Sequence, residues 1–211
     1  MEHKMVSIAD QIFDELEKAI LTGEYERGDI LTEIKLSEKM GVSRTPIREA
    51  LRRLDQERII EITAKGAKVI GINDRDIADI YDIRLRIEGM ASFLAAQRRS
   101  EEDMQRLKRI LDLQEFYTKK EDADQIKNYD SEFHLALYQI CQCPTLLDTL
   151  EPLHRKVIKF RKVSVAHPGR AQKSFAEHKA IYDAIAEGDA INAEKLTCEH
   201  IANARKSILG K

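Results

Sequence analysis

The larger, C-terminal part of the chain is patterned for helix alone. From Asp76 to about Lys206, apolar residues recur every three or four positions, and no segment shows the alternation of a half-buried strand. Only 9 glycines and 4 prolines occur among 211 residues, roughly half the usual share, which argues against a many-stranded sandwich or barrel. We expect an antiparallel all-α bundle with helices near 75–98, 100–118, 122–142, 145–164, 171–187 and 189–208.

Neither a membrane-spanning nor a secretory segment is visible in the sequence. No apolar run approaches the roughly 18 residues of a membrane span, and the N-terminal MEHKMVSIADQ lacks the apolar core of a secretory signal. Three cysteines are an odd number for a disulfide framework. The sequence therefore predicts a cytoplasmic protein with reduced thiols and no membrane partner.

The first part of the chain combines short helices with a hairpin. After a helix over VSIADQIFDELEKAIL come a short helix near 33–40, a tight turn at Gly41 and a helix over 43–57, which together form a helix-turn-helix. The runs IIEI and AKVIGI flank residues 63–66 as a small β-hairpin, or wing. The mostly α chain thus divides into a winged helix-turn-helix domain over 1–72 and an all-helical domain over 73–211.

The helix expected from Ser43 has an apolar face and a basic face. The apolar stripe consists of Ile47, Ala50, Leu51 and Leu54, and the basic stripe consists of Arg44, Arg48 and Arg52. No carboxylate of the same helix faces these arginines, so we expect them to be available to a partner. A solvated surface is the alternative, but residues 44–68 hold seven basic and four acidic residues (7 − 4 = +3) in a chain of net charge −2. This contrast favours binding to double-stranded DNA.

The start of this helix has the chemistry of a DNA-reading element. Ser43 is a typical N-cap, and Pro46 falls in the first turn, where its missing N–H is harmless. The free N–H groups and the partial positive charge of the helix start are suited to a phosphate. In the DNA interpretation Arg44, Thr45 and Arg48 enter the major groove. Arginine there suits bidentate contact with guanine O6 and N7, while Thr45 equally suits a phosphate.

Three further residues are candidates for contact outside the base edges. Arg52 continues the basic stripe and is suited to a phosphate. Lys65 lies at the expected hairpin tip beside Gly66, which has no side chain to obstruct approach, and would reach the minor groove or its phosphates. For Lys65 alone, an exposed loop lysine is an equally good interpretation.

The segment KLSEKMGVSRTPIREALRRL, with GEYERGDILTE before it and KGAKV after it, resembles the DNA-binding domain of the GntR family of bacterial transcription regulators. GVSRTPIREAL agrees with the family over eleven positions. The resemblance implies operator-contacting positions for Arg44, Thr45, Pro46, Arg48 and Gly66. Two departures are visible: Ile34 stands where many members have arginine, and Arg58 replaces the usual glycine before the wing.

Four residues of the expected bundle have the spacing of a metal site. Asp130 and His134 are four residues apart on one helix, hence on one face, while His178 and His200 lie beside apolar residues on two other helices. Three imidazoles and one carboxylate suit zinc, nickel, manganese or iron(II), and residue types do not select among these metals. Taken singly, each histidine is better interpreted as a satisfied core or surface residue than as a metal ligand. The remaining histidines lack such a pattern: His3, His154 and His167.

The same region resembles the FCD effector-binding domain of the FadR subfamily of GntR regulators. The matching patterns are DxxxH, EHKAIYDAIAEGD with a later histidine on the final helix, and DIYDIRLRIEGMASFLAA as the domain's first helix. The resemblance implies a divalent transition metal, zinc or nickel foremost, at Asp130, His134, His178 and His200. It also implies that Arg84 clamps a carboxylate effector, with Arg161 as a second candidate. A surface ion pair between Arg84 and Glu88 is the alternative.

Together these patterns predict a homodimeric transcriptional regulator, a repressor in the first instance, and not an enzyme. Its operator affinity would respond to a small organic-acid metabolite at the metal site, and two-fold symmetry would call for a pseudo-palindromic operator. Two alternatives stay open. One is a metal-dependent enzyme acting on a small organic acid, and the other is a zinc-stabilised dimeric DNA-binding protein without an effector.

Overall fold

The computed structural model describes residues 7–157 and 169–210. The chain divides into two compact units, Met1–Asn73 and Asp74–Lys211. Both units are built mainly from helices, and the first also contains a small sheet, which confirms the predicted fold class. Among the described helices, none combines the length and the apolar character that crossing a bilayer requires.

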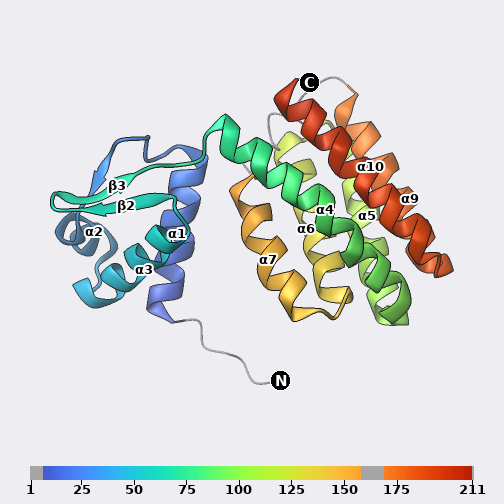
Figure 1. Ribbon diagram of the computed structural model, residues 1–211, viewed down its shortest axis with the longest axis horizontal. Helices are drawn as coiled ribbons and strands as arrows, with labels where there is room; N and C mark the ends of the chain where they lie inside the picture. Colours follow the sequence, from blue (N-terminus) through green and yellow to red (C-terminus); the bar gives the residue numbers. More distant parts are fainter. Residues whose placement is uncertain (1–6, 158–168, 211) are drawn as a thin grey trace. The chain divides into compact units, whose positions relative to one another are not determined.

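Three helices form the scaffold of the first unit: α1 (Ile8–Thr22), α2 (Glu33–Met40) and α3 (Arg44–Gln56) (Figure 1). A capping box between Ser7 and Asp10 begins α1, and Gly23 ends it with a φ of 85°, a conformation that glycine adopts without a Cβ penalty. The helices pack around a continuous apolar core. As predicted, α3 contributes to this core with one stripe: Ile47, Ala50, Leu51 and Leu54.

The turn between α2 and α3 positions the start of α3. Gly41 closes α2 with a φ of 67°, and Ser43 stands at the N-cap of α3 with an extended backbone. The expected capping by Ser43 is wrong in one respect, because its side chain makes no capping hydrogen bond. Ser43 is exposed, so water can satisfy both its hydroxyl group and the first-turn N–H groups.

A three-stranded sheet completes the first unit, with antiparallel pairing in the order β1-β3-β2. Its strands are β1 (Ile30–Leu31), β2 (Ile60–Thr63) and β3 (Gly66–Val69). The β2–β3 hairpin confirms the predicted wing, whereas β1 was not expected because two residues carry no alternation. A Cβ on Gly66, whose φ is 130°, would lie 2.7 Å from the Leu31 carbonyl oxygen, so this close approach requires glycine. Arg58 adopts a φ of 58°, the left-handed conformation that explains a glycine preference at its position.

The second unit is a helical bundle, as predicted (Figure 1). Its described helices are α4 (Asp74–Arg98), α5 (Glu101–Lys119), α6 (Ala123–Ile140), α7 (Pro144–Lys156), α9 (Arg170–Glu187) and α10 (Ala190–Leu209). Helices α4 and α10 lie side by side over much of their length. They meet closely at Gly89, where a Cβ would lie 2.7 Å from the Cys198 Sγ atom.

Most helix ends of the bundle carry the signals that the sequence suggested. Ser100 caps α5 through a capping box with Asp103, and Pro144 occupies the first turn of α7. The expected helix over 145–164 ends earlier, because α7 stops at Lys156 with Val157 as its C-cap. The rest of that expected helix lies outside the described residues.

Candidate functional site

A hollow on the first unit lies between the start of α2, the basic face of α3 and the β2–β3 hairpin. Its volume is about 480 Å³. Five of the seven predicted DNA-contacting residues line it: Arg44, Arg48, Arg52, Lys65 and Gly66. The other two are near the same helix end, Thr45 exposed and Pro46 half-buried. The four basic side chains are all exposed, and Glu33 is the one acidic residue in the lining of the hollow, so the hollow presents a net positive charge to a partner.

Arg48 is paired across this hollow, contrary to the expectation that all three arginines of the stripe would be left available. Its Nε and Nη2 atoms donate hydrogen bonds to Oε1 and Oε2 of Glu33, at 2.8 and 2.7 Å. The hydrogen bonds from Arg48 lower the pKa of Glu33, with attraction to Arg48, Arg44 and Arg52 adding to the effect. Glu33 belongs to α2, so a search for partners within α3 could not find it.

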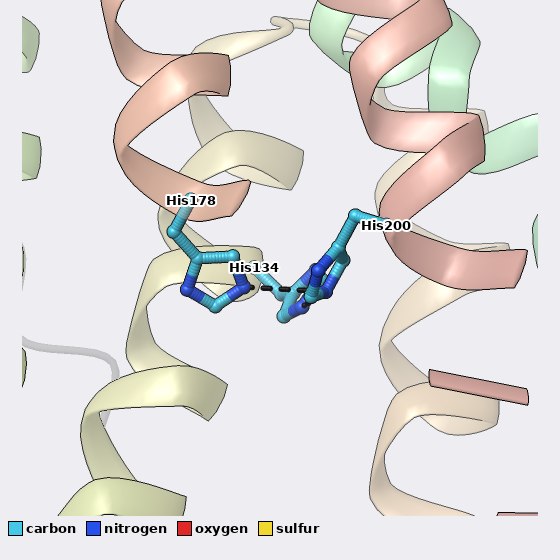
Figure 2. Close-up of side chains that lie close together, drawn as sticks. All are labelled: His134, His178 and His200. Atoms are coloured by element: carbon cyan, nitrogen blue, oxygen red, sulfur yellow. Dashed lines mark hydrogen bonds between the residues drawn. The ribbon is translucent and has the colours of Figure 1, made fainter. Parts of the chain in front are cut away.

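Three imidazoles from three helices converge in the interior of the second unit. His134 of α6, His178 of α9 and His200 of α10 are at most 2% exposed. The Nε2 atom of His200 lies 3.2 Å from the Nε2 atoms of both His134 and His178 (Figure 2). One ligand nitrogen from each ring falls within a span of 4.8 Å, which fits a single metal ion.

An oxygen acceptor holds the opposite nitrogen of each imidazole. The pairs join Nδ1 of His134 to Glu88 Oε1 at 2.5 Å, Nδ1 of His178 to Gln114 Oε1 at 3.0 Å, and Nδ1 of His200 to Glu177 Oε2 at 2.7 Å. An imidazole that donates its Nδ1–H to such an acceptor presents the lone pair of Nε2 to the centre. Three nitrogen lone pairs that converge in a buried place are suited to a cation, so the chemistry of these side chains fits a metal ion.

Asp130, the fourth predicted ligand, is brought to the same place. It is 5% exposed, and its Oδ1 atom lies 3.7 Å from Nε2 of His178 and accepts a hydrogen bond of 3.1 Å from Ser174 Oγ. The carboxylate therefore lies beside His178, whereas the ligand atoms that converge within 4.8 Å of one another among the described residues are those of the three histidines.

His154 of α7 is a residue that sequence reasoning left out. It is fully buried, its ring lies 5.3 Å from that of His134 between centroids, and its Nδ1 atom lies 3.4 Å from the Tyr138 hydroxyl group. A signal was present, because Leu146, Leu150 and His154 recur every four residues and form the buried stripe of α7. Glu88, Gln114 and Glu177 were likewise not predicted as partners of the histidines.

Arg84 is fully buried beside this cage. Its Nε and Nη2 atoms bind Glu88 at 2.8 and 3.2 Å, so the ion pair considered from the sequence forms, but in the core rather than on the surface. Burial alone would lower the pKa of Arg84, yet the Glu88 carboxylate raises it above its usual value, while Arg84 and His134 lower that of Glu88 despite its burial. Arg161, the second predicted effector residue, lies outside the described residues.

Three buried polar atoms around Arg84 and Gln114 have no hydrogen-bond partner within residues 7–157 and 169–210. They are Nη1 of Arg84, the Tyr81 hydroxyl oxygen and Nε2 of Gln114. The Arg84 guanidinium carbon lies 5.0 Å from the Tyr81 ring centroid, so two of these groups are neighbours. Each of the three can donate a hydrogen bond, and buried donors without acceptors are costly. The neighbouring donors of Arg84 and Tyr81 therefore suit an anionic or oxygen-rich ligand.

Comparison with known proteins identifies the class. The bacterial regulatory proteins of the gntR family match residues 8–70, and the FCD domain matches residues 79–203. The chain therefore belongs to the GntR family and carries an FCD domain. Similar proteins include transcriptional repressors and regulators, which argues against the enzyme alternative.

Individual relatives resemble the chain to different extents. The gluconate operon transcriptional repressor of Bacillus licheniformis is 39% identical over 120 residues, covering 57% of this chain and 49% of that protein. The chain thus matches about half the length of that relative. The Uxu operon regulator of Haemophilus influenzae is 30% identical over 210 residues, covering 90% and 77%. Among solved structures, Escherichia coli McbR/YncC superposes with a TM-score of 0.79 at 25% identity, covering 94% and 95%.

Proposed function

We propose that this protein is a DNA-binding transcriptional repressor whose operator affinity is set by a carboxylate metabolite held near a divalent metal. Arg44, Thr45 and Arg48 enter the major groove, and Pro46 leaves the helix start free to face a phosphate. Arg52 and Lys65 add phosphate contacts, and Gly66 keeps the wing close to the duplex. The exposed basic hollow between α3 and the hairpin supports this role.

The repressor acts as a homodimer on a pseudo-palindromic operator. One helix-turn-helix covers only a few base pairs, so two copies related by a two-fold axis are needed for a specific site. The two recognition helices then read half-sites about one helical turn apart. Cross-linking and light scattering of the full chain test the dimer directly.

The cage of three imidazoles is the observation that carries the sensing part of the proposal. His134, His178, His200 and Asp130 would hold the metal, with zinc or nickel foremost and manganese or iron(II) as the other candidates. When bound, the metal supplies a positive charge and open coordination positions for a carboxylate. Glu88, Gln114 and Glu177 orient the three rings, so the cage is preformed.

Arg84 completes the effector site from the protein side. Its Nη1 atom is buried and finds no acceptor among the described residues, and a carboxylate of the effector would provide one. The Tyr81 hydroxyl group and the Gln114 amide supply two further donors for hydroxyl or carboxylate oxygens. An organic acid would therefore satisfy groups that have no partner in the part of the chain that the structure describes. It must bind one arrangement of the dimer better than the other, because only differential affinity shifts that equilibrium.

The test compares two histidines of the same core. His178→Ala removes a cage nitrogen, whereas His154→Ala removes an imidazole whose nitrogens are not part of the converging set. We expect elemental analysis of purified protein to find metal lost in His178→Ala and retained in His154→Ala, with DNA binding preserved in both. Full metal content in His178→Ala would refute the ligand set.

The effector arm uses defined carboxylates as probes. Gluconate is one, because relatives that match part of this chain are named for a gluconate operon, and citrate is another. We expect one class of carboxylate to change operator affinity in the metal-loaded protein, and the change to be lost in His178→Ala. Saturation with zinc and no response to any carboxylate would instead favour the zinc-stabilised regulator without an effector.

A further inference from the structure

The Arg48–Glu33 pair has a geometry that leaves one edge of the guanidinium group unused. Glu33 takes the side edge, formed by Nε and Nη2, at 2.8 and 2.7 Å. A guanidinium carries five N–H donors, so the end edge, formed by Nη1 and the second N–H of Nη2, still has a complete fork. This end fork is the edge that reaches O6 and N7 of a guanine.

The partner of Arg48 comes from a different helix, which makes the pair a brace across the hollow. Glu33 lies in the first turn of α2, where the N–H groups favour a carboxylate, and its side chain is 32% exposed against 55% for Arg48. An arginine without such a partner loses rotamer entropy when it binds DNA. Held by Glu33, the guanidinium plane is fixed before the duplex arrives.

Glu33 also changes what Arg48 is attracted to. The carboxylate lies within the field of three arginines, since Arg44, Arg48 and Arg52 all act on it, and it lines the same hollow. It cancels much of the charge of Arg48 and repels phosphates nearby, yet it leaves the end fork of Arg48 intact. A neutralised arginine gains little from any phosphate but still gains from a guanine edge.

From this geometry we infer that Glu33 is a specificity-determining residue, which positions Arg48 for a base edge and discourages phosphate contact by the same side chain. This inference rests on the proposed DNA contact by Arg48. It assigns to α2 a part in sequence discrimination, whereas the proposed function places base reading on α3 alone.

The experiment measures discrimination, not affinity alone. The probes are a 30-base-pair duplex selected by the wild-type full-length protein from random DNA, and a scrambled duplex of equal composition. For Glu33→Gln we expect the ratio of the two affinities to fall about tenfold, within the range of a bidentate base contact. We also expect binding to the scrambled duplex to strengthen and its salt dependence to steepen by about one phosphate contact.

Matched variants distinguish the positioning of Arg48 from a general charge effect and from an effect that does not involve Arg48. Glu24→Gln breaks another exposed pair of the same unit, Glu24 with Lys39 at 3.1 Å, outside the hollow, and should leave the ratio unchanged. In an Arg48→Ala background, Glu33→Gln should no longer alter base preference, because the brace has nothing left to position. Thermal unfolding of each variant checks that the domain is folded.

Two results would overturn the inference. If Glu33→Gln changes specific and scrambled binding by the same factor, Glu33 is only a local electrostatic or structural group. If Glu33→Gln still alters base preference without Arg48, it acts by another route. Failure of the proposed base contact itself is a separate result, because Arg48→Ala alone would then leave the discrimination ratio at its wild-type value.

Discussion

Each of the two units contains an arginine held side-on by a glutamate, and the two pairs differ in their access to water. Both arginines donate hydrogen bonds from Nε and Nη2 to the two carboxylate oxygens of the glutamate. The Arg48 side chain is 55% exposed and that of its partner 32%, whereas Arg84 and Glu88 are 0% and 1% exposed. The guanidinium N–H groups that do not bind glutamate are therefore exposed to solvent in the first unit and buried in the second.

The two arginines therefore differ in the free-energy cost of N–H groups that have no protein acceptor. The unused N–H groups of Arg48 are exposed and can bind water at no cost in stability, and the exposed ion pair itself contributes little to stability. In the core, Arg84 Nη1 has no hydrogen-bond acceptor among residues 7–157 and 169–210, so a ligand that supplies one gains more than it would at the surface. The Arg48–Glu33 pair fixes the orientation of the Arg48 guanidinium group. The Arg84–Glu88 pair makes the stability of the second unit depend on whether a ligand binds Arg84.

The largest expected effect comes from removing the glutamate of the buried pair. Glu88→Ala leaves Arg84 charged in a dry core and also removes the acceptor of His134. We expect the free energy of unfolding to fall by about 3–5 kcal/mol, measured by urea denaturation of the full chain. Glu33→Ala, the matching change in the exposed pair, should scarcely move the urea midpoint. Similar losses in both variants would show that burial does not distinguish the pairs.

Metal binding should stabilise the unit that holds the buried pair. At a free zinc concentration about 100 times the dissociation constant, binding to the native state alone adds about 2.7 kcal/mol. We therefore expect zinc to raise the thermal midpoint of the wild-type protein after chelation, and to leave that of His178→Ala unchanged. A rise of equal size in His178→Ala would place the bound zinc elsewhere in the chain.

A smaller effect is expected at the buried Tyr81 hydroxyl group, which has no hydrogen-bond partner in residues 7–157 and 169–210. Tyr81→Phe keeps the ring beside Arg84 and removes the hydroxyl group, so the effector-free protein should gain about 1 kcal/mol in unfolding free energy. The control is Tyr25→Phe in the first unit, because the Tyr25 hydroxyl group accepts a hydrogen bond from Lys39 at 3.0 Å. Urea denaturation should show a gain only for Tyr81→Phe. A loss there would mean that the hydroxyl group is already satisfied.

The sequence was most informative for features that depend on the pattern within a single helix or hairpin. The buried stripe of α3 and the hairpin follow from periodicities of 3.6 and 2, which fix the face of a residue within its own element. The convergence of α6, α9 and α10 on one metal site was predicted mainly from the resemblance to the FCD domain. The missed features join separate elements. Glu33 reaches Arg48 across 15 positions, and Gln114 reaches His178 across 64. No local pattern encodes such distances, and β1 is too short to show one.

The smallest expected effect is the loss, at acid pH, of the stabilisation that the exposed Arg48–Glu33 pair provides. The pKa of Glu33 is lowered in the folded protein by hydrogen bonds from Arg48, so folding favours its charged form. The stabilisation is therefore complete above the unfolded pKa of about 4.3 and is lost as the pH falls through the lower folded value.

We expect the difference in urea midpoint between wild type and Glu33→Gln to be small and constant from about pH 8 to pH 5, and to vanish below the folded pKa. The sign follows from the direction of the shift, because protonated Glu33 and glutamine are alike in charge and size. A difference that grew toward acid pH would mean that Arg48 is not what holds Glu33 in its charged form. The proposed brace across the hollow would then lose its electrostatic basis, while the buried pair of the second unit would be unaffected.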